Sequence, residues 1–103
     1  MTGLGHRQVW WADLGKVRPV VVLTRSSVAP RLSRVVVAPV TTTVRGLRIE
    51  VPLGPDEGVA VDSVANLDNV QLLGVALLLR QAGSVAPARW SEFCEAMGAV
   101  LAC

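Results

Sequence analysis

Two short segments of this sequence bring together side chains suited to chemistry on a phosphate. Arg18 precedes Pro19 at the start of an apolar segment, and the restricted backbone of the proline would hold the guanidinium at the rim of a sheet. Thr41, Thr42 and Thr43 directly follow another apolar segment. Because guanidinium and hydroxyl groups both donate hydrogen bonds to phosphate oxygens, the combination favours a phosphate as the ligand.

A third segment is rich in amide, hydroxyl and carboxylate groups, and consists of Asp62, Ser63, Asn66, Asp68 and Asn69. Such groups read the edges of unpaired nucleotides. All three segments also have a structural interpretation. Arg18 could form an ion pair with Asp13 or Asp62, and the threonines and the third segment could simply form turns.

The charged side chains divide the chain into a basic and an acidic half. Residues 1–54 hold eight basic and two acidic side chains, whereas residues 55–103 hold two basic and six acidic ones, for a net charge of +2. Nine of the ten basic residues are arginine, which suits bidentate contact with phosphate. The pattern favours a polyanionic partner for the first half, and the alternative is a solvated surface whose charges happen to segregate.

Length and composition exclude several classes of protein. A chain of 103 residues is expected to form a single domain, and 51% hydrophobic against 17% charged residues excludes disorder. The longest apolar run, Leu72–Leu79, is short of the ~20 residues that cross a bilayer. The first residues do not follow the charged, then apolar, then small pattern of a secretory signal, so none is expected. Cys94 and Cys103 are interpreted as a core thiol and a tail thiol, which suits the cytoplasm. With one histidine, His6, expected at a frayed terminus, the sequence predicts neither a metal site nor a cofactor.

Valine-rich segments dominate the chain and predict a mainly β protein. The alternation of apolar and polar residues across Leu47–Leu53 indicates a strand with Glu50 on its polar face, and Val75–Leu79 is left open between strand and helix. Apolar residues at three- and four-residue steps predict a helix over Pro87–Leu101. The other strands are predicted at Gln8–Asp13, Pro19–Thr24, Arg34–Val40, Val59–Val64 and Leu67–Leu72. Because the connections are too short for crossover helices, five to seven strands should form a bent antiparallel sheet or partial barrel packed by the terminal helix.

Four motifs, in order, resemble the MazF/PemK family of bacterial toxin endoribonucleases. They are the RPVVVL of Arg18–Leu23, the VAPVTT of Val37–Thr42, the DSV of Asp62–Val64 and the NLDNV of Asn66–Val70. The resemblance extends from about Gln8 to the end of the chain. It implies an SH3-like barrel of the CcdB–PemK type with a C-terminal helix, acting as a homodimer in the bacterial cytoplasm.

The resemblance also implies an activity. Such toxins cleave single-stranded RNA in a sequence-specific manner without a metal, and the attack of the ribose 2′-OH leaves a 2′,3′-cyclic phosphate and a 5′-OH. Their cleavage of RNA inhibits translation and growth, and a cognate MazE-like antitoxin holds them inactive.

The family's catalytic positions match Arg18 and Thr41, and its RNA contacts match Ser63, Asp68 and Asn69. The residues themselves add further candidates for RNA binding, namely Trp11, Asp13, Thr42 and Arg45. Because arginine does not readily deprotonate, Arg18 is expected to stabilise charge rather than to act as the base. Trp11 is interpreted as a residue that stacks on a base or belongs to the core, with Trp10 pointing to the opposite face of the same strand.

The sequence departs from many relatives in its first loop, where Leu14–Val17 replaces a longer, glycine-rich segment that includes a glutamate. The departure leaves the general base unidentified, with Asp13 and His6 as the candidates. A short loop should open the site, so we predict cleavage of loops in folded RNA, transfer or ribosomal, at least as readily as of messenger RNA. Two alternative functions remain: a gyrase poison with the same fold, and an inactive RNA-binding paralogue.

Overall fold

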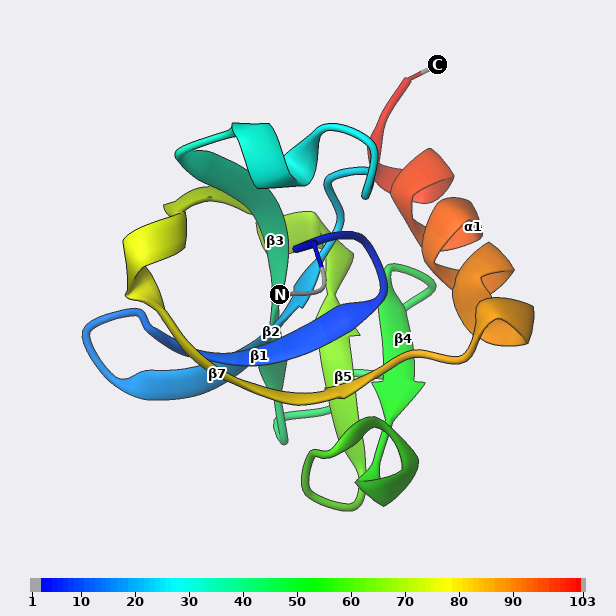
Figure 1. Cartoon of the computed structure of the whole chain (residues 1–103). Helices are drawn as coiled ribbons and strands as arrows, with labels where there is room; N and C mark the ends of the chain where they lie inside the picture. Colours follow the sequence, from blue (N-terminus) through cyan, green and yellow to red (C-terminus); the bar gives the residue numbers. More distant parts are fainter. Residues whose placement is uncertain (1–2, 103) are drawn as a thin grey trace.

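Seven β-strands and one α-helix make up the computed structural model, which describes residues 3–102 (Figure 1). The strands are β1 (Gln8–Asp13), β2 (Val17–Val22), β3 (Arg34–Thr41), β4 (Glu50–Leu53), β5 (Ser63–Asn66), β6 (Gln71–Gly74) and β7 (Leu78–Ser84), and the helix is α1 (Trp90–Val100). All strand pairs are antiparallel, in the order β4-β5-β3-β2-β1-β7, with β6 beside β3. The predicted mainly β architecture with a C-terminal helix is confirmed.

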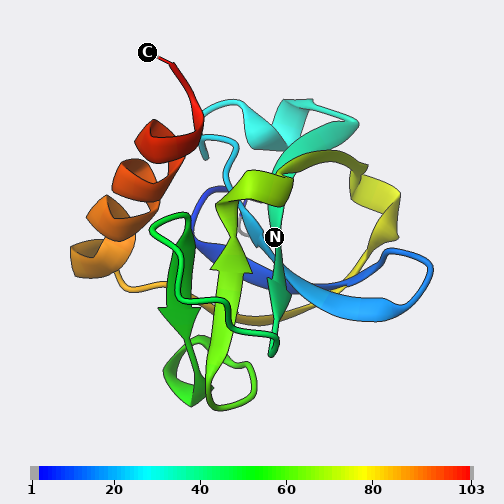
Figure 2. The same ribbon diagram turned by 180° about the vertical axis from the view of Figure 1, so that it is seen from behind.

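β3 is the strand around which the sheet bends. One edge of β3 pairs with β2, while the other edge pairs with β6 over Arg34–Val37 and with β5 at Val40 and Thr41. The change of partner spans Pro39, which has no backbone N–H to donate to a ladder. Since β4 lies beyond β5, the connection from β3 to β4 passes across β5 (Figure 2). The bend thus places the end of β3 and the start of β5 side by side.

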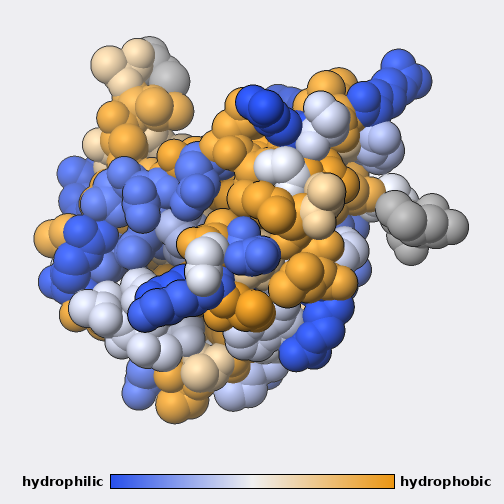
Figure 3. All heavy atoms as spheres, turned by 90° about the vertical axis from the view of Figure 1, so that its left-hand side faces the viewer, coloured by the Kyte–Doolittle hydropathy of each residue, from blue (hydrophilic) through white to orange (hydrophobic). Residues whose placement is uncertain are grey.

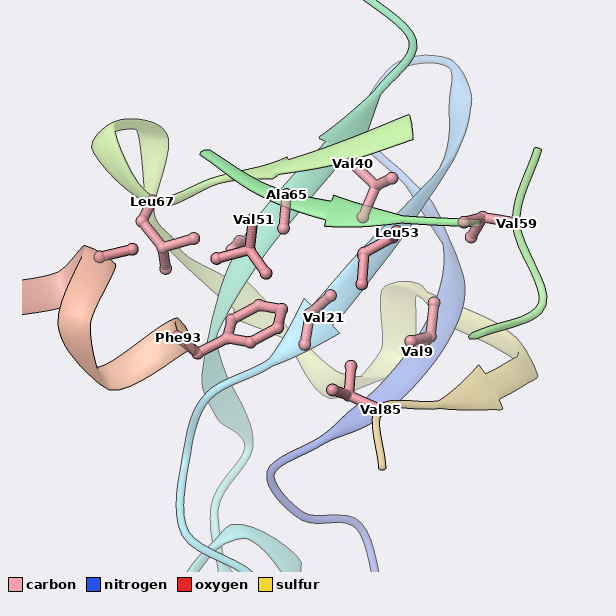
Figure 4. Close-up of a cluster of buried hydrophobic side chains, with 12 residues drawn as sticks. Val9, Val21, Val40, Val51, Leu53, Val59, Ala65, Leu67, Val85 and Phe93 are labelled. Carbon is pink, nitrogen blue, oxygen red and sulfur yellow. The ribbon is translucent and has the colours of Figure 1, made fainter. Parts of the chain in front are cut away.

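Two hydrophobic cores cover the two faces of the central strands. On β2, Val21 points into one core while Val20 and Val22 point into the other, as the period of two in a strand requires. Figure 4 shows the first core, where Val21 lies close to Phe93 of α1. The Leu4 and Ala29 side chains help to cover the second core. The apolar run of β2 is therefore buried on both faces of the sheet.

The C-terminal helix begins three residues later than predicted, because Pro87–Arg89 forms a 3₁₀ turn. Phe93 and Ala96 are its buried residues. No side chain caps the start of the helix, but Arg89 donates to the Glu92 carboxylate and to the Pro52 carbonyl oxygen of β4, both within 2.8 Å. These contacts hold the helix against the sheet.

The predicted strands Val59–Val64 and Leu67–Leu72 overlap the observed strands only at their ends, because the chain forms β5 over Ser63–Asn66 and β6 over Gln71–Gly74. β5 begins four residues later than the first of these predicted strands and includes Ala65 and Asn66, which the prediction left between the two strands. Asp62 before it has a φ of 59°, which ends any extended segment, and Leu67–Asn69 forms a 3₁₀ turn. β7 was not predicted beyond Leu79, because this edge strand buries none of its residues fully and so shows no alternation.

Three further expectations need correction. Glu50, placed on the polar face of a strand, is buried, and the strand begins only at this residue. Cys94 is exposed rather than in the core, because Phe93 and Ala96 occupy the core face of the helix, while Cys103 lies outside the described residues. His6 is not frayed. Its Nδ1 accepts a hydrogen bond from the Ser26 backbone N–H at 3.2 Å.

Two glycines allow a close backbone contact that positions the loop before β5. Gly58 has a φ of 85°, and a Cβ added there would collide with the Ala82 carbonyl oxygen. A Cβ on Gly83 would lie 2.5 Å from the Glu57 carbonyl oxygen. Any other residue would push the turn at Pro55–Glu57 away from β7, so this contact holds the Val59–Asp62 segment near the sheet.

Candidate functional site

Arg18 is the second residue of β2, at a corner of the sheet. It pairs with Ala12 of β1, whereas pairing with β3 begins only at Val20. The side chain is exposed, and within residues 3–102 it takes part in no ion pair. The alternative interpretation, an ion pair with Asp13 or Asp62, is therefore not observed in that part of the chain. The donors of the Arg18 guanidinium are available to a ligand.

Thr41 is the last residue of β3 and lies beside Val64 of β5. Its Oγ1 accepts a hydrogen bond from the Thr43 backbone N–H at 3.1 Å, which is the turn that threonine favours at a strand end. That bond uses the hydroxyl oxygen as the acceptor and leaves the hydroxyl hydrogen free. Thr41 can therefore take part in the turn and still donate to a phosphate oxygen.

Arg18 and Thr41 line one small hollow on the surface, which we call the Arg18–Thr41 pocket. It has a volume of about 180 Å³ and lies where β1, β2, the end of β3 and the start of β5 meet. The other residues that line it are Trp11, Pro19, Val40, Thr42, Ala60 and Ser63. Arg18 is the one charged side chain among these described residues, so the pocket is suited to an anion.

Ser63 contributes to the wall of this pocket rather than to its set of donors. The side chain is buried, and its Oγ donates a hydrogen bond to the Ala60 carbonyl oxygen at 2.6 Å. The hydroxyl hydrogen is thus already in use. Ser63 keeps the Val59–Asp62 segment closed against the start of β5, and this places Ala60 at the pocket.

Trp11 has a neighbour that the sequence analysis did not single out. Arg80 is its register partner on β7, and the Cζ of Arg80 lies over the indole ring, 5.5 Å from the ring centroid. The signal in the sequence was the isolation of Arg80, one of only two basic residues in the acidic half. Without the register between β1 and β7, nothing linked it to Trp11.

Arg45, predicted to bind RNA, is instead held by protein groups. Its Nε donates to the Glu50 carboxylate at 2.9 Å, and its Nη2 donates to the Asp68 carboxylate at 3.0 Å and to the Asn66 side-chain oxygen at 3.3 Å. Glu50 also accepts hydrogen bonds from the backbone N–H groups of Arg45 and Leu47. We call the four side chains Arg45, Glu50, Asn66 and Asp68 the Arg45 cluster.

The electrostatics of the Arg45 cluster follow from these hydrogen bonds. Asp68 and then Glu50 raise the pKa of the Arg45 guanidinium. The hydrogen bond from Arg45 holds the pKa of Glu50 below its ordinary value, against an opposing effect of desolvation. The Glu50 side chain is only 2% exposed, because the Arg45 side chain, which is itself 41% exposed, lies between it and the solvent. The cluster therefore stays charged and closes the loop between Thr42 and Glu50.

The remaining predicted residues lie outside the lining of the Arg18–Thr41 pocket. Asp13 accepts a hydrogen bond from the Gly15 backbone N–H at 3.0 Å in the turn between β1 and β2. Asn69 is exposed in the 3₁₀ turn after β5. His6, a candidate base, lines a different hollow with Ser26. The structure thus brings together Arg18, Thr41, Trp11, Thr42 and Ser63, and separates the others from them.

A larger hollow of about 440 Å³ lies between the end of α1 and the sheet, but it is mostly apolar. Its lining includes Leu23, Val36, Leu67 and Met97, and the Asp68 carboxylate at its edge already pairs with Arg45. Within residues 3–102 no group of three or more His, Cys, Asp or Glu side chains is arranged to hold a metal ion. No helix in that range is long and apolar enough to cross a membrane.

Comparison with known protein families gives a match over nearly the whole chain. Residues 6–101 match the family described as PemK-like, MazF-like toxin of type II toxin-antitoxin system. The chain is 42% identical to a probable endoribonuclease MazF5 of Mycobacterium tuberculosis over 107 aligned positions, which cover 100% of this chain and 98% of that protein. It is 45% identical to the endoribonuclease MazF3 of the same species, over 89% of each chain.

Solved structures agree with the sequence matches. The fold superimposes on the Mycobacterium tuberculosis toxin MazF-mt6 with a TM-score of 0.88 and 44% identity, covering 91% of this chain and 95% of that one. A mycobacterial endoribonuclease in complex with its cognate antitoxin matches with a TM-score of 0.85 and 26% identity, covering 95% and 94%. The predicted fold is thereby confirmed.

Proposed function

This chain belongs to the PemK-like, MazF-like toxins of type II toxin–antitoxin systems and is an endoribonuclease, and we propose that it cleaves single-stranded RNA in the Arg18–Thr41 pocket. The observation that supports this site is an arginine without an ion-pair partner in residues 3–102 beside a threonine hydroxyl with a free hydrogen. Both donors face the same small hollow, which is the arrangement that a transferring phosphate requires.

The proposed reaction is an in-line transfer within the RNA. The ribose 2′-oxygen forms a bond to the adjacent phosphorus while the bond from phosphorus to the 5′-oxygen of the next nucleotide breaks. The 2′-OH loses a proton and the leaving oxygen gains one, so the products are a 2′,3′-cyclic phosphate and a 5′-OH. No water, metal or cofactor enters this balance. DNA lacks the 2′-OH and would bind without being cut.

Arg18 and Thr41 act on the charge that builds up on the phosphate oxygens. The guanidinium supplies a positive charge and the hydroxyl a second hydrogen bond, both held in place before the substrate arrives. Neither Asp13 nor His6 is among the residues lining the pocket, and no carboxylate or imidazole belongs to that described lining. The contribution of the pocket is therefore stabilisation of the transition state.

The predicted RNA-binding residues fall into three groups in this proposal. Trp11, Thr42 and Ser63 line the pocket and would contact or shape the site around the cleaved phosphate. Arg45 and Asp68 belong to the Arg45 cluster and act by holding the loop that follows Thr42. Asp13 and Asn69 are exposed and free of the pocket, where they can contact more distant nucleotides.

The short turn after β1 favours a substrate that is itself folded. Only Leu14, Gly15 and Lys16 separate β1 from β2, and Gly15 adopts a φ of 90° to make the turn. No long loop therefore lies over the pocket in this part of the chain. We expect RNA loops in transfer or ribosomal RNA to reach the site at least as readily as messenger RNA.

Two protein partners complete the proposal. A MazE-like antitoxin would inhibit the toxin in the bacterial cytoplasm, in keeping with the antitoxin complex of the mycobacterial relative. A second copy would cover exposed apolar side chains on β6, on the Val75–Leu77 turn and on β7, the side seen in Figure 3. They are Leu72, Leu77 and Leu79, which are 60%, 41% and 54% exposed. Light scattering should then give twice the chain mass of 10.9 kDa.

Incubation of the purified protein with total RNA in the presence of EDTA tests the cleavage reaction. A matched pair of oligonucleotides, one RNA and one DNA, accompanies the total RNA. We expect cuts in RNA alone, and fragments that end in 2′,3′-cyclic phosphate and begin with 5′-OH. Mapping the ends on messenger, transfer and ribosomal RNA then gives the preferred sequence, and scattered cuts in messenger RNA only would contradict the preference for loops.

Failure of the folded protein to cut any RNA would overturn the proposed reaction and favour one of the two alternatives. An inactive RNA-binding paralogue would still bind RNA in a salt-dependent manner without product. A gyrase poison would remain toxic to cells after Arg18→Ala, because its target would not depend on this pocket.

A further inference from the structure

We propose that Arg80, oriented by Trp11, forms a second phosphate-binding subsite beside the Arg18–Thr41 pocket. Its ligand would be a backbone phosphate of the RNA next to the cleaved bond. The inference rests on the proposed function, since it assigns a further binding residue to the same site. It gives a role to a basic residue that belongs to none of the family-like motifs of the sequence.

The register of the sheet places Arg80 and the pocket on opposite sides of Trp11. On β1, Trp11 pairs with Pro19 of β2 on one side and with Arg80 of β7 on the other. Adjacent strands are about 4.8 Å apart, so the backbones at Pro19 and Arg80 are separated by about 10 Å. Arg18 lines the same pocket as Trp11 and Pro19, so an RNA strand that enters this pocket can also reach Arg80 on the other side of Trp11.

Arg80 differs from the other basic residue of the acidic half in its partners. Arg89 is paired with Glu92 at 2.8 Å and with Glu57 at 3.5 Å. Arg80 is exposed, and within residues 3–102 it forms no ion pair. β7 itself contains no acidic residue that could pair with it along the strand. The guanidinium charge is therefore available to an external anion.

The contact with the indole ring prepares this guanidinium for a phosphate. A cation over an aromatic face is held by the ring quadrupole, and this attraction restricts the orientations that the guanidinium can adopt. The N–H groups of a guanidinium lie in its plane and point outward from its edge. When the plane is held over an aromatic ring, this edge stays accessible, and a phosphate can accept two hydrogen bonds from it. Because Arg80 lies over the ring, Trp11 is a positioning residue for Arg80 rather than a stacking platform on that face.

Binding of short oligouridylate and oligothymidylate, measured over a range of salt concentrations, tests the subsite without requiring cleavage. We expect Arg80→Ala to weaken both ligands by roughly five- to tenfold and to lower the slope of log K against log salt by about 0.7, the value for one phosphate of a single strand. Arg34→Ala is the matched control. Arg34 is exposed and begins β3, about 23 Å along the strand from Thr41, so it should leave binding and slope unchanged.

The role of Trp11 is tested by two substitutions with different outcomes. Trp11→Phe keeps an aromatic face under Arg80 and should retain most of the binding, whereas Trp11→Leu should match Arg80→Ala. On a cleavable RNA, Arg80→Ala should raise KM and leave kcat within about twofold, because the contact is equal in the ground state and the transition state. Unfolding midpoints of all variants identify any loss that comes from folding.

Equal affinity and equal salt slope for Arg80→Ala and Arg34→Ala would overturn the subsite, whether or not the protein cuts RNA. A defect with oligouridylate but not with oligothymidylate would also overturn it, because a phosphate contact is common to both. Absence of RNA cleavage by the wild-type protein would instead contradict the proposed function, and the binding measurements would still decide the subsite.

Discussion

Arg18 and Arg45 are the same side chain in two different settings, and the contrast separates binding from folding in this protein. Arg45 donates to Glu50, Asp68 and Asn66, and its charge is balanced by two carboxylates. Arg18 has no ion-pair partner within residues 3–102 and faces a hollow with the Thr41 hydroxyl. From the sequence alone, both residues were predicted to belong to the RNA site.

The difference teaches that the partners of an arginine, and not its position in a motif, decide whether it can bind phosphate. A guanidinium that already satisfies carboxylates would have to leave them before taking a ligand, and the carboxylates would then repel that ligand. A guanidinium without such partners only has to release bound water when a phosphate binds. The Arg18–Thr41 pocket should therefore control activity, and the Arg45 cluster should control stability.

The largest expected effect is on cleavage in Arg18→Ala. Loss of the one charged donor of the pocket should lower kcat by about 10²–10³, as the removal of a preorganised donor does in other enzymes. Its unfolding midpoint should stay close to that of the wild-type protein, because Arg18 is exposed. Initial rates on a defined RNA and thermal denaturation measure the two effects.

Arg45→Ala is the matched comparison for Arg18→Ala. It should lower the unfolding midpoint by several degrees, because it leaves the buried Glu50 carboxylate without its partner, and it should reduce cleavage less than Arg18→Ala does. If Arg45→Ala proves the more damaging to kcat at a temperature where both variants are folded, the assignment of the two arginines is reversed.

A smaller effect on cleavage is expected from Thr41→Val, which keeps the shape of the side chain and removes the hydroxyl. We expect kcat to fall about ten- to a hundredfold, since one neutral hydrogen bond to the transition state is lost. Thr41→Ser retains the hydroxyl and should keep most of the activity. Similar rates for the valine and serine variants would show that the hydroxyl serves only the turn with Thr43.

The smallest effect concerns the pH dependence of stability in the Arg45 cluster. Because Arg45 lowers the pKa of Glu50 below its ordinary 4.5, the ionised carboxylate stabilises the fold above that pH. The contribution is lost as the pH falls through the pKa of the folded state. Glu50→Gln should therefore have a lower unfolding midpoint than the wild-type protein near pH 7, and the difference should shrink below about pH 4.5.

Glu95→Gln is the control for this measurement, because Glu95 is exposed on α1 and has no ion pair within the described residues. Its unfolding midpoint should follow that of the wild-type protein at every pH. A constant difference between Glu50→Gln and the wild-type protein down to pH 3 would mean that the Glu50 charge is not the stabilising feature.

Strands with a strong local signal were predictable, and those that depend on distant contacts were not. β1 and β3 contain runs of apolar or alternating residues, and their predicted bounds agree with the structure to within one residue. β5 holds only four residues and exists because it joins β3 to β4, while β7 is an edge strand beside β1. Neither has an apolar pattern of its own.

The site shows the same division. The sequence indicates the types of group at Arg18 and Thr41, because an arginine before a strand and a threonine after one are visible in the order of residues. It does not show that Glu50 would be buried under Arg45, or that Arg80 would lie over Trp11. The contact between Arg80 and Trp11 joins β7 to β1, which are neighbours only in the folded sheet, and Glu50 is buried because it begins β4, which pairs with β5.

The sequence by itself determined the family, the mainly β fold with its terminal helix, and the two groups that we propose bind phosphate, near the start of β2 and at the end of β3. Only the tertiary structure decided which arginines are available, since an ion pair forms wherever a carboxylate comes within reach. Within residues 3–102, Arg18 lies at a corner of the sheet and forms no ion pair with a carboxylate, whereas Arg45 lies on a loop beside Glu50 and Asp68 and pairs with both. The physical reason is that hydrogen bonds and ion pairs depend on distances of about 3 Å, which sequence order does not specify.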